Sequence, residues 1–390
     1  MKKLLSFIAT IAIIGVALSF IFPLDKDVTD ILPQIGNNKS SSSVSISKDS
    51  YWYNKLTDNE KKAYRNVYAS ILDFPEKVAI PKVDDKEIQN VFQALSYDNP
   101  ELFFLGYSSS VISVGYKYYF KPEYVLSKEL YTSYMEQVKT VVKEMNVATQ
   151  GLSEYEKELY VHDYLISNCE YNDNAGDMKT TVYGALINKQ ANCEGYARST
   201  QMILNNLGVK SRVIIGDATS EDGQVEGHMW NIVTLSGKEY NLDVTWDDSK
   251  VNGVQADNIS HSHMYMNIPT KDIVSTHKST YEQDYANCIY DDYNYYKISG
   301  LCFDSYDSNA KSKIINEIVR QSKKGGSNIE IKFSNKAAYD SATSRLFDSK
   351  EIHRLIVRAN LETLGKIVNG EVSYTNTPDK FIIRVFYKLK

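Results

Sequence analysis

The sequence predicts an α+β protein, and three observations support this class. Apolar residues recur with helical spacing after Cys193, and Gly208 is placed to end that helix. Strand-like stretches follow, at 211–216 and in two runs over 228–235 and 238–246 that flank a Ser-Gly turn. Two capping boxes, each a Ser or Thr followed three residues later by Glu, open helices upstream.

The first 22 residues predict export. Lys2 and Lys3 precede a charge-free, mostly apolar run over 4–22, and Ala17-Leu18-Ser19 offers a small-residue cleavage site. The run is also long enough for an uncleaved membrane anchor, so signal peptide and anchor both stay open. In either case we expect the lysines to stay inside the cell and the remaining chain to lie outside.

Two further regions precede the centre of the chain. Residues 23–50, with serine at all four positions of 40–43, predict a disordered linker because they cannot bury enough apolar surface to order themselves. Residues 51–148 predict a helical or α+β domain that begins with the capping box of Thr57 and Glu60. Its expected elements are helices from Thr57 to Leu72, over 85–95 and over 126–145, and strand-like residues over 111–120.

The central region, 149–290, carries the residues with chemistry. A capping box at Ser153 opens a helix through Ser167. In the hairpin around Ser236-Gly237, a two-residue turn would place Trp230 opposite Asp243. His228 is then the diagonal neighbour of Asp243 on the same face, at about 7–8 Å between backbones.

A thiol, an imidazole and a carboxylate follow one another in this region. Cys193 comes at the start of a predicted helix, where unpaired backbone N–H groups and the helix dipole favour a thiolate. The same N–H groups could stabilise an oxyanion on an attacked carbonyl. His228 could act as the base for Cys193, and Asp243 could orient the imidazole. The sequence therefore predicts a catalytic triad of Cys193, His228 and Asp243.

These blocks resemble the transglutaminase-like superfamily of papain-related cysteine enzymes. The resemblance rests on Asn192-Cys193-Glu194-Gly195-Tyr196, Gly227-His228-Met229-Trp230-Asn231 and Leu242-Asp243-Val244-Thr245-Trp246, with looser matches at Tyr183-Gly184-Ala185-Leu186 and around His162. It covers residues of about 150 to 250 and implies a helix that carries the cysteine, packed on an antiparallel sheet. Asn99-Pro100-Glu101-Leu102-Phe103-Phe104 looks like a segment that precedes the catalytic domain in exported bacterial relatives.

Aromatic residues and acidic pairs near the triad allow more than one interpretation. Trp230 shares the predicted face of His228, so Trp230 and Tyr183 are candidates for a substrate-binding cleft, or for simple packing. Arg198 is expected to form a salt bridge or to pack. Asp247-Asp248 is expected to form a solvated turn, because it lacks the alternating oxygen ligands of a calcium loop.

Other candidate sites give weaker signals. Cys169 is expected to be structural, whereas Cys288 and Cys302 could form a disulfide or stay free. His261, His263 and His277, with Asp257, match no recognised zinc spacing, so we expect them to lie in a polar loop and expect no required metal and no cofactor. The 44 basic and 49 acidic residues leave a net charge of −5 without a basic stripe, which makes nucleic acid an unexpected partner.

The last hundred residues, 291–390, predict a second small α+β domain. Its pattern gives a helix from Ser308, a strand over 329–333, two more helical stretches and a final strand over 381–387.

Together these observations predict an exported cysteine-dependent amide acyltransferase or hydrolase. It would act on protein or peptide substrates outside the cell or on the outer face of the cytoplasmic membrane, by cross-linking, deamidation or proteolysis. The alternative is a catalytically inert peptide-binding or scaffold protein that keeps the same fold.

Overall fold

The computed structural model describes residues 46–220, 223–248 and 262–390. The predicted export segment, Asp257 and His261 lie outside these residues. Within them, no helix is both long and apolar enough to cross a membrane. The chain divides into two compact units: residues up to 239 together with 276–285, and residues 240–275 together with 286–390. The three folded domains predicted from the sequence stay a prediction.

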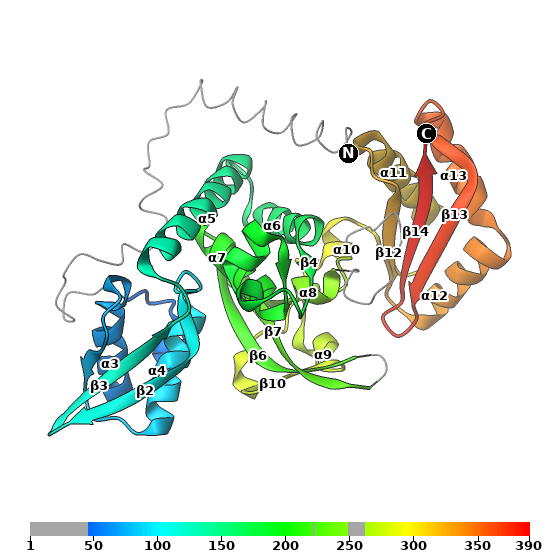
Figure 1. Cartoon of the computed structure of the whole chain (residues 1–390). Coiled ribbons are helices and arrows are strands. Elements are labelled where there is room, and N and C mark those ends of the chain that lie inside the picture. The colour runs from blue at the N-terminus through cyan, green and yellow to red at the C-terminus, as the bar shows by residue number, and fades with distance from the viewer. Residues whose placement is uncertain (1–45, 221–222, 249–261) are drawn as a thin grey trace. The chain divides into compact units, whose positions relative to one another are not determined.

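Unit 1 begins with an α+β module in which helices pack beside a three-stranded antiparallel sheet of order β1-β3-β2 (Figure 1). The capping box at Thr57 is confirmed, because its hydroxyl accepts from the Glu60 N–H at 3.3 Å while the Glu60 carboxylate accepts from the Thr57 N–H at 2.7 Å. The elements are α2 Tyr51–Lys55, α3 Asp58–Tyr68, β1 Val78–Ile80, α4 Asp85–Asp98, β2 Leu105–Val114, β3 Lys117–Tyr124 and α5 Lys128–Ala148.

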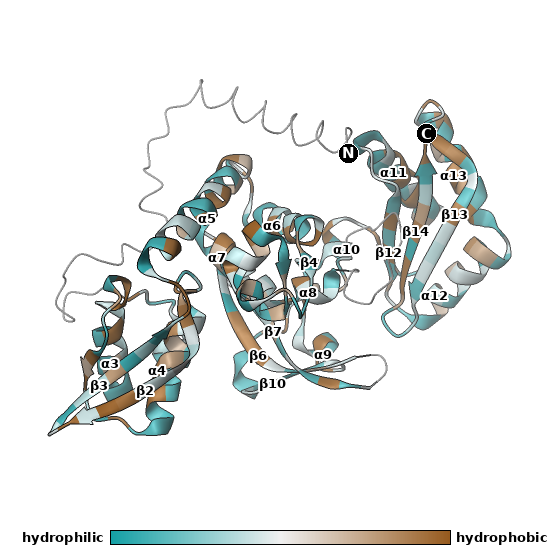
Figure 2. Cartoon of the chain, in the orientation of Figure 1, coloured by the Kyte–Doolittle hydropathy of each residue, from teal (hydrophilic) through white to brown (hydrophobic). Residues whose placement is uncertain are grey.

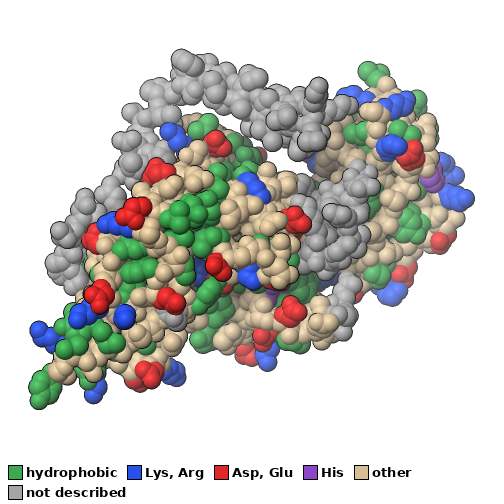
Figure 3. Space-filling model, viewed as in Figure 1, with side chains coloured by type: hydrophobic (Ala, Val, Ile, Leu, Met, Phe, Trp, Pro, Cys, Tyr) green, Lys and Arg blue, Asp and Glu red, His purple; other side chains and the backbone are tan. Residues whose placement is uncertain are grey.

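The strand-like residues predicted over 111–120 lie in two strands. Residues 111–114 belong to β2 and 117–120 belong to β3. Gly115 has a φ of +65° and forms a tight turn with Tyr116 between them. Val114 and Tyr116, beside this turn, are exposed. Figure 3 shows hydrophobic side chains at the end of the β2–β3 hairpin, at the lower left of the view.

The rest of unit 1 is built around one buried helix. Helix α7 contacts strands β6 and β7, and its residues 195–204 are all buried. Figure 2 shows hydrophobic residues along β6, where Val213 and Ile214 have no exposed surface. The elements are α6 Glu154–Asn168, β4 Glu170–Tyr171, β5 Gln190–Ala191, α7 Cys193–Asn206, β6 Lys210–Thr219, β7 Val225–Leu235 and β10 His277–Ser279.

The sheet order is β10-β6-β7-β8-β9, with β8 at Lys238–Leu242 and β9 at Met266–Ile268. Between β7 and β8, Ser236 and Gly237 both have positive φ, at 49° and 78°. This combination is typical of a type I′ hairpin turn, so the predicted two-residue turn is confirmed.

The second predicted strand of this hairpin is too long. It ends at Leu242, and residues Val244–Asp247 form the short helix α8. The Asp243 side chain accepts a hydrogen bond from the Trp246 N–H at 3.1 Å, which caps the helix and removes Val244 from the predicted apolar strand face.

The prediction of a solvated turn at Asp247-Asp248 is also wrong. The two residues are only 0% and 1% exposed. The Asp247 carboxylate accepts from the Tyr265 N–H at 2.9 Å, so it serves as a buried acceptor for the backbone.

Unit 2 contains a four-stranded sheet of order β11-β12-β14-β13 with helices packed against it. Its core includes Ile314 and Ile318 on α11 and Ile331 on β12. The predicted helix from Ser308 and the two predicted strands are confirmed, whereas β13 was not predicted. The remaining elements are α9 Thr270–Ile273, α10 Tyr295–Ile298, β11 Cys302–Phe303, α11 Ser308–Lys324, β12 Asn328–Phe333, α12 Lys336–Thr343, α13 Glu351–Glu362, β13 Ile367–Thr377 and β14 Ile382–Leu389.

Candidate active site

Cys193 is the first residue of α7, as the sequence predicts. Asn192 caps the helix, because its side chain accepts from the Gly195 N–H at 3.3 Å. The Cys193 thiol is free and the residue is half-buried. A thiol in this place lies at the positive end of the helix dipole, next to the unpaired backbone N–H groups of the helix start.

The backbone packs closely around this helix start. A methyl group on Gly195 would lie 2.3 Å from the Lys179 carbonyl oxygen, and one on Gly184 would lie 2.1 Å from the Met178 carbonyl oxygen. The Asn192 N–H also donates to the Lys179 carbonyl at 3.0 Å. The segment before the cysteine is therefore held in place by a close backbone approach that only glycine permits.

Tyr171 is a neighbour of the thiol that the sequence reasoning missed. It pairs with Ala191, two residues before Cys193, in the parallel β4–β5 ladder. Burial raises the pKa of the Tyr171 phenol, with smaller contributions from its hydrogen bond to Asp173 and from the negative charges of Cys193, Asp173 and Glu226. Nothing in the sequence marks Tyr171, because it approaches the thiol through a two-residue strand pairing.

Glu194 does not leave an unbalanced negative charge beside Cys193. The Arg198 guanidinium lies one turn further along α7 and forms an ion pair with the Glu194 carboxylate at 2.7 Å. Arg198 also donates to the Ser96 carbonyl at 2.8 Å and to the Ser96 hydroxyl at 2.6 Å. The salt-bridge role predicted for Arg198 is confirmed.

His228 lies on β7 opposite Gly216 of β6. A methyl group on Gly216 would lie 2.1 Å from the Lys278 carbonyl oxygen, because the neighbouring strand β10 lies close to β6 at this point. The His228 ring stacks with Trp230 at 6.1 Å between centroids and meets His277 edge-on at 5.2 Å. Two aromatic neighbours thus restrict the orientation of the candidate base.

The two candidate cleft residues are both buried. Trp230 has no exposed surface, and Tyr183 is 8% exposed. Tyr183 stacks on Tyr134 of α5 at 3.9 Å, whereas the Trp230 ring meets the His277 ring edge-on at 5.3 Å. The structure therefore gives both residues packing partners within unit 1.

Asp243 is buried in unit 2, at 1% exposure. One oxygen of the Asp243 carboxylate caps α8. The backbone N–H of Asp243 donates to the Tyr265 carbonyl at 3.2 Å. These two hydrogen bonds hold Asp243 in place directly after β8.

The histidines and the other cysteines have definite surroundings. The His263 imidazole hydrogen-bonds with Glu330 at 3.3 Å and stacks on Tyr295, so it is buried and not in a polar loop. The hydrogen bond and charge of His263, with a smaller contribution from the charge of Arg384, keep the pKa of the Glu330 carboxyl below its usual value despite burial. Cys288 and Cys302 are not joined by a disulfide, so of the two alternatives that the sequence left open, the disulfide is not formed. His228 and His277 could each offer a nitrogen to a metal ion. The expectation that the protein requires no metal or cofactor therefore stays a prediction.

Residues 141–244 match the family model described as the transglutaminase-like superfamily. The match includes Cys193, His228 and Asp243. No curated protein matches the chain.

Solved structures give weak overall similarity. A putative cysteine protease from Cytophaga hutchinsonii is 12% identical with a TM-score of 0.24, and the match covers 35% of this chain and 61% of that chain. A structure described as a TGase is 14% identical with a TM-score of 0.26, covering 54% of this chain and 58% of that one. A putative protease from Parabacteroides distasonis is 14% identical with a TM-score of 0.22, covering 35% of each chain.

The family match and the helix-on-sheet architecture agree with each other. This protein has mixed helices and sheets with a transglutaminase-like core over residues 141–244. The resemblance drawn from the sequence is therefore confirmed for that core.

Proposed function

We propose that the protein is a cysteine-dependent enzyme that transfers or hydrolyses acyl groups of amides in proteins or peptides. The observation that carries this proposal is the position of Cys193 at the N-terminus of the buried helix α7, within the transglutaminase-like core. A half-buried thiol beside helix N–H groups has the setting of an activated nucleophile.

The hairpin supports the roles of His228 and Asp243. Leu235 ends β7 and Lys238 begins β8, with the type I′ turn between them. Counting residues back from this turn puts Leu242, the last residue of β8, opposite Asn231. Asp243 directly follows Leu242, so we propose that it lies near Trp230, two positions along β7 from His228. At this diagonal separation, about 7–8 Å between backbones, a carboxylate and an imidazole can meet. In the proposed triad Asp243 orients the His228 ring.

The proposed reaction has two stages. His228 takes the thiol proton of Cys193, and the thiolate attacks the carbonyl carbon of the substrate amide. The C–N bond breaks, His228 returns the proton to the departing ammonia or amine, and a thioester remains on Cys193. Water or a second amine then attacks the thioester, the C–S bond breaks, and the thiol regains its proton.

Several finer points of the proposal depend on the substrate. Water as the second nucleophile gives deamidation or proteolysis, whereas a lysine amine gives a cross-link. We propose an extracellular or membrane-anchored location, on the basis of the apolar run in residues 4–22. The partners would then be proteins or peptides at the cell surface.

The test is the alkylation rate of Cys193 as a function of pH in the full-length chain. We expect Cys193 to react well below the free-thiol pKa of about 8.5, and to lose this reactivity in His228→Ala. Cys302 is an internal reference, because burial raises the pKa of its thiol, and peptide mapping separates the two sites. Cys193→Ala should abolish amide turnover.

The opposite results would favour the inert peptide-binding protein. If Cys193 alkylates with the pH dependence of an ordinary thiol in both the wild type and His228→Ala, no activated thiolate exists. If Cys193→Ala retains amide turnover, the thiol mechanism is wrong.

A further inference from the structure

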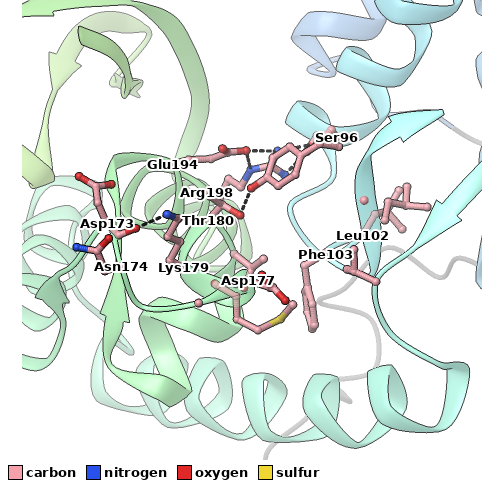
Figure 4. Close-up of a pocket in the computed structure, with 17 residues that line it drawn as sticks. Ser96, Leu102, Phe103, Asp173, Asn174, Asp177, Lys179, Thr180, Glu194 and Arg198 are labelled. Carbon is pink, nitrogen blue, oxygen red and sulfur yellow. Dashed lines mark hydrogen bonds and ion pairs between the residues drawn. The ribbon is translucent and has the colours of Figure 1, made fainter.

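A cavity lies beside the start of α7, between the N-terminal module and the segment that precedes Cys193 (Figure 4). Its volume is about 410 Å³. One wall comes from residues 96–107 and Val125 of the module, and the other from residues 173–181 together with Glu194 and Arg198. Every lining residue belongs to unit 1.

The two walls are joined across the cavity. The Tyr107 hydroxyl on β2 donates to the Thr180 hydroxyl of the opposite wall. Burial and the charge of Glu194 raise the pKa of Tyr107 to about 12, so its hydroxyl keeps the proton that makes this bond. Arg198 forms a second link through its bonds to Ser96. The module is therefore a structural part of the cavity.

The module side of the cavity is largely apolar. Leu102 and Phe103 are buried at 3% exposure each and form part of the wall, with Leu105 and the half-exposed Val125. Figure 4 shows Leu102 and Phe103 on this side and Asp173, Asn174 and Lys179 on the other. Such a surface suits the methylene stem of a long side chain.

The charges of the opposite wall favour a cation. Arg198 is neutralised by Glu194 at 2.7 Å, and the Lys179 ammonium donates to the Asp173 backbone carbonyl. Asp173 and Asp177 are exposed, and the Asp177 carboxylate forms no ion pair with any residue in 46–220, 223–248 and 262–390. Against the single remaining cation of Lys179, two carboxylates leave an excess of one negative charge.

The cavity is next to the candidate thiol without containing it. Glu194 lines the cavity and directly follows Cys193, whereas Cys193 is not among the lining residues. A side chain bound here would therefore lie close to the thiol but would not itself react with it.

We propose that this cavity binds a lysine or arginine side chain of the polypeptide substrate. The methylene stem packs on Leu102 and Phe103, and the cationic end lies at Asp177 and Asp173. The N-terminal module thereby becomes a specificity determinant of the enzyme. The proposal rests on the proposed function in one respect, since it takes the bound polypeptide to be the substrate of Cys193.

The test compares two small probes by saturation-transfer NMR titration on the full-length chain. Nα-acetyl-lysine methylamide carries the ammonium, and Nα-acetyl-norleucine methylamide has the same backbone and an apolar chain without it. We expect the lysine probe to bind about fivefold more tightly. Asp177→Asn should remove this preference and leave the affinity for the norleucine probe unchanged.

Two further variants identify the site. Asp379→Asn makes the same substitution at an exposed aspartate outside the cavity and should change neither affinity. Val125→Trp should fill the cavity from its half-exposed rim and weaken both probes. Equal binding of the probes to the wild type, no binding of either, or a lysine preference that survives Asp177→Asn or Val125→Trp would each overturn the proposal.

The titrations are repeated in Cys193→Ala, where no thioester can form. A lysine preference in that variant supports the cavity even if Cys193 proves unreactive. Conversely, a reactive Cys193 without any lysine preference would leave the proposed function standing and refute the cavity proposal.

Discussion

At the scale of single residues, Asp243 has one role in the structure and a second in the proposed mechanism. It caps α8 through the Trp246 N–H, and it is proposed to orient His228. Asn caps a helix about as well as Asp, so Asp243→Asn separates the two roles. We expect nearly unchanged thermal stability and a loss of about a hundredfold in the rate of Cys193 alkylation at neutral pH.

A matched control for this variant is Asp307→Asn. Asp307 also caps a helix, α11, by accepting from the Ala310 N–H at 2.9 Å. Asp307→Asn should change neither the reactivity of the Cys193 thiol nor the stability of the protein by much. If Asp243→Asn alkylates as fast as Asp307→Asn, Asp243 has no part in activating the thiol.

A second prediction concerns Gly195, two residues after the thiol. Gly195→Ala would place a methyl group 2.3 Å from the Lys179 carbonyl oxygen, so the backbone must shift. We expect a loss of about 1–3 kcal/mol in the free energy of unfolding, together with a slower Cys193 alkylation. Urea unfolding and the alkylation rate measure the two effects.

Gly227→Ala is the comparison for Gly195→Ala. Gly227 directly precedes His228, but a methyl group there meets nothing within 4 Å. Stability and thiol reactivity should both stay near those of the wild type. Equal losses in the two variants would contradict the close-packing argument.

The contrast between these residues shows what the sequence could predict. The type and order of Cys193, His228 and Asp243 carry chemical information by themselves, and the family match covers all three. The requirement for glycine at 195 arises from Lys179, which is distant in sequence and approaches only in the folded chain. Tyr171 likewise comes close to Cys193 only in the folded chain, so the sequence gives no sign of this contact.

At the scale of elements, the β7–β8 turn sets the register that the proposed triad needs. Gly237 has a φ of +78°, which costs a residue with a Cβ atom about 1–2 kcal/mol. Gly237→Ala should lower the free energy of unfolding by about that amount and slow Cys193 alkylation, because a relaxed turn shifts Asp243 relative to His228.

Gly325→Ala is a control that introduces similar backbone strain but does not affect the register of β7 and β8. Gly325 ends α11 with a φ of +86°, and a methyl group there meets nothing within 4 Å. This variant should lose similar stability but keep the thiol reactivity of the wild type. If both variants leave the alkylation rate unchanged, the turn does not position the proposed triad.

Elements with strong local signals could be predicted, and those without them could not. The helices that begin at capping boxes lie where their Ser or Thr predicts. Strand β13 was missed because most of its residues are exposed, so no alternation of apolar and polar residues marks it. The strand beyond Leu242 was overextended because Asp243 acts as a helix cap, a role that competes with strand pairing.

At the scale of the whole molecule, unit 1 joins the N-terminal module to the helix that carries Cys193. The Gln201 side chain of α7 donates to the Tyr97 carbonyl at 2.8 Å, and the Trp52 indole donates to the Val213 carbonyl at 3.2 Å. These contacts involve residues far apart in the sequence, which explains why the sequence could not reveal them. Stability of the module should therefore influence the candidate site.

Two buried carboxyl groups lie in this part of the module. Burial raises the pKa of Asp98 to about 6 although its carboxylate accepts from the Trp52 and Tyr53 N–H groups. Burial also raises the pKa of Glu101 to about 7, and its Oε1 atom has no hydrogen-bond partner among the described residues. Both groups therefore keep their protons to a higher pH in the folded state than in the unfolded state.

The sign of the resulting pH dependence follows from proton binding. Below pH 4.5 Glu101 is protonated in both states, whereas between pH 4.5 and about 7 only the folded state keeps the proton. The free energy of unfolding should therefore fall as the pH rises through this window, by about 3 kcal/mol from Glu101, and then level off. Glu101→Gln mimics the neutral form and should remove this contribution.

Urea unfolding of the wild type and of Glu101→Gln at pH 4, 6 and 8 tests the prediction, with hydrogen exchange of the α4 amides reporting on the module. The two proteins should have similar stability at pH 4, and Glu101→Gln should be more stable at pH 8, because it avoids a buried charge. Glu76→Gln, at an exposed site, should follow the wild type throughout. A difference between Glu101→Gln and the wild type that does not change with pH would show that Glu101 titrates alike in the folded and unfolded states.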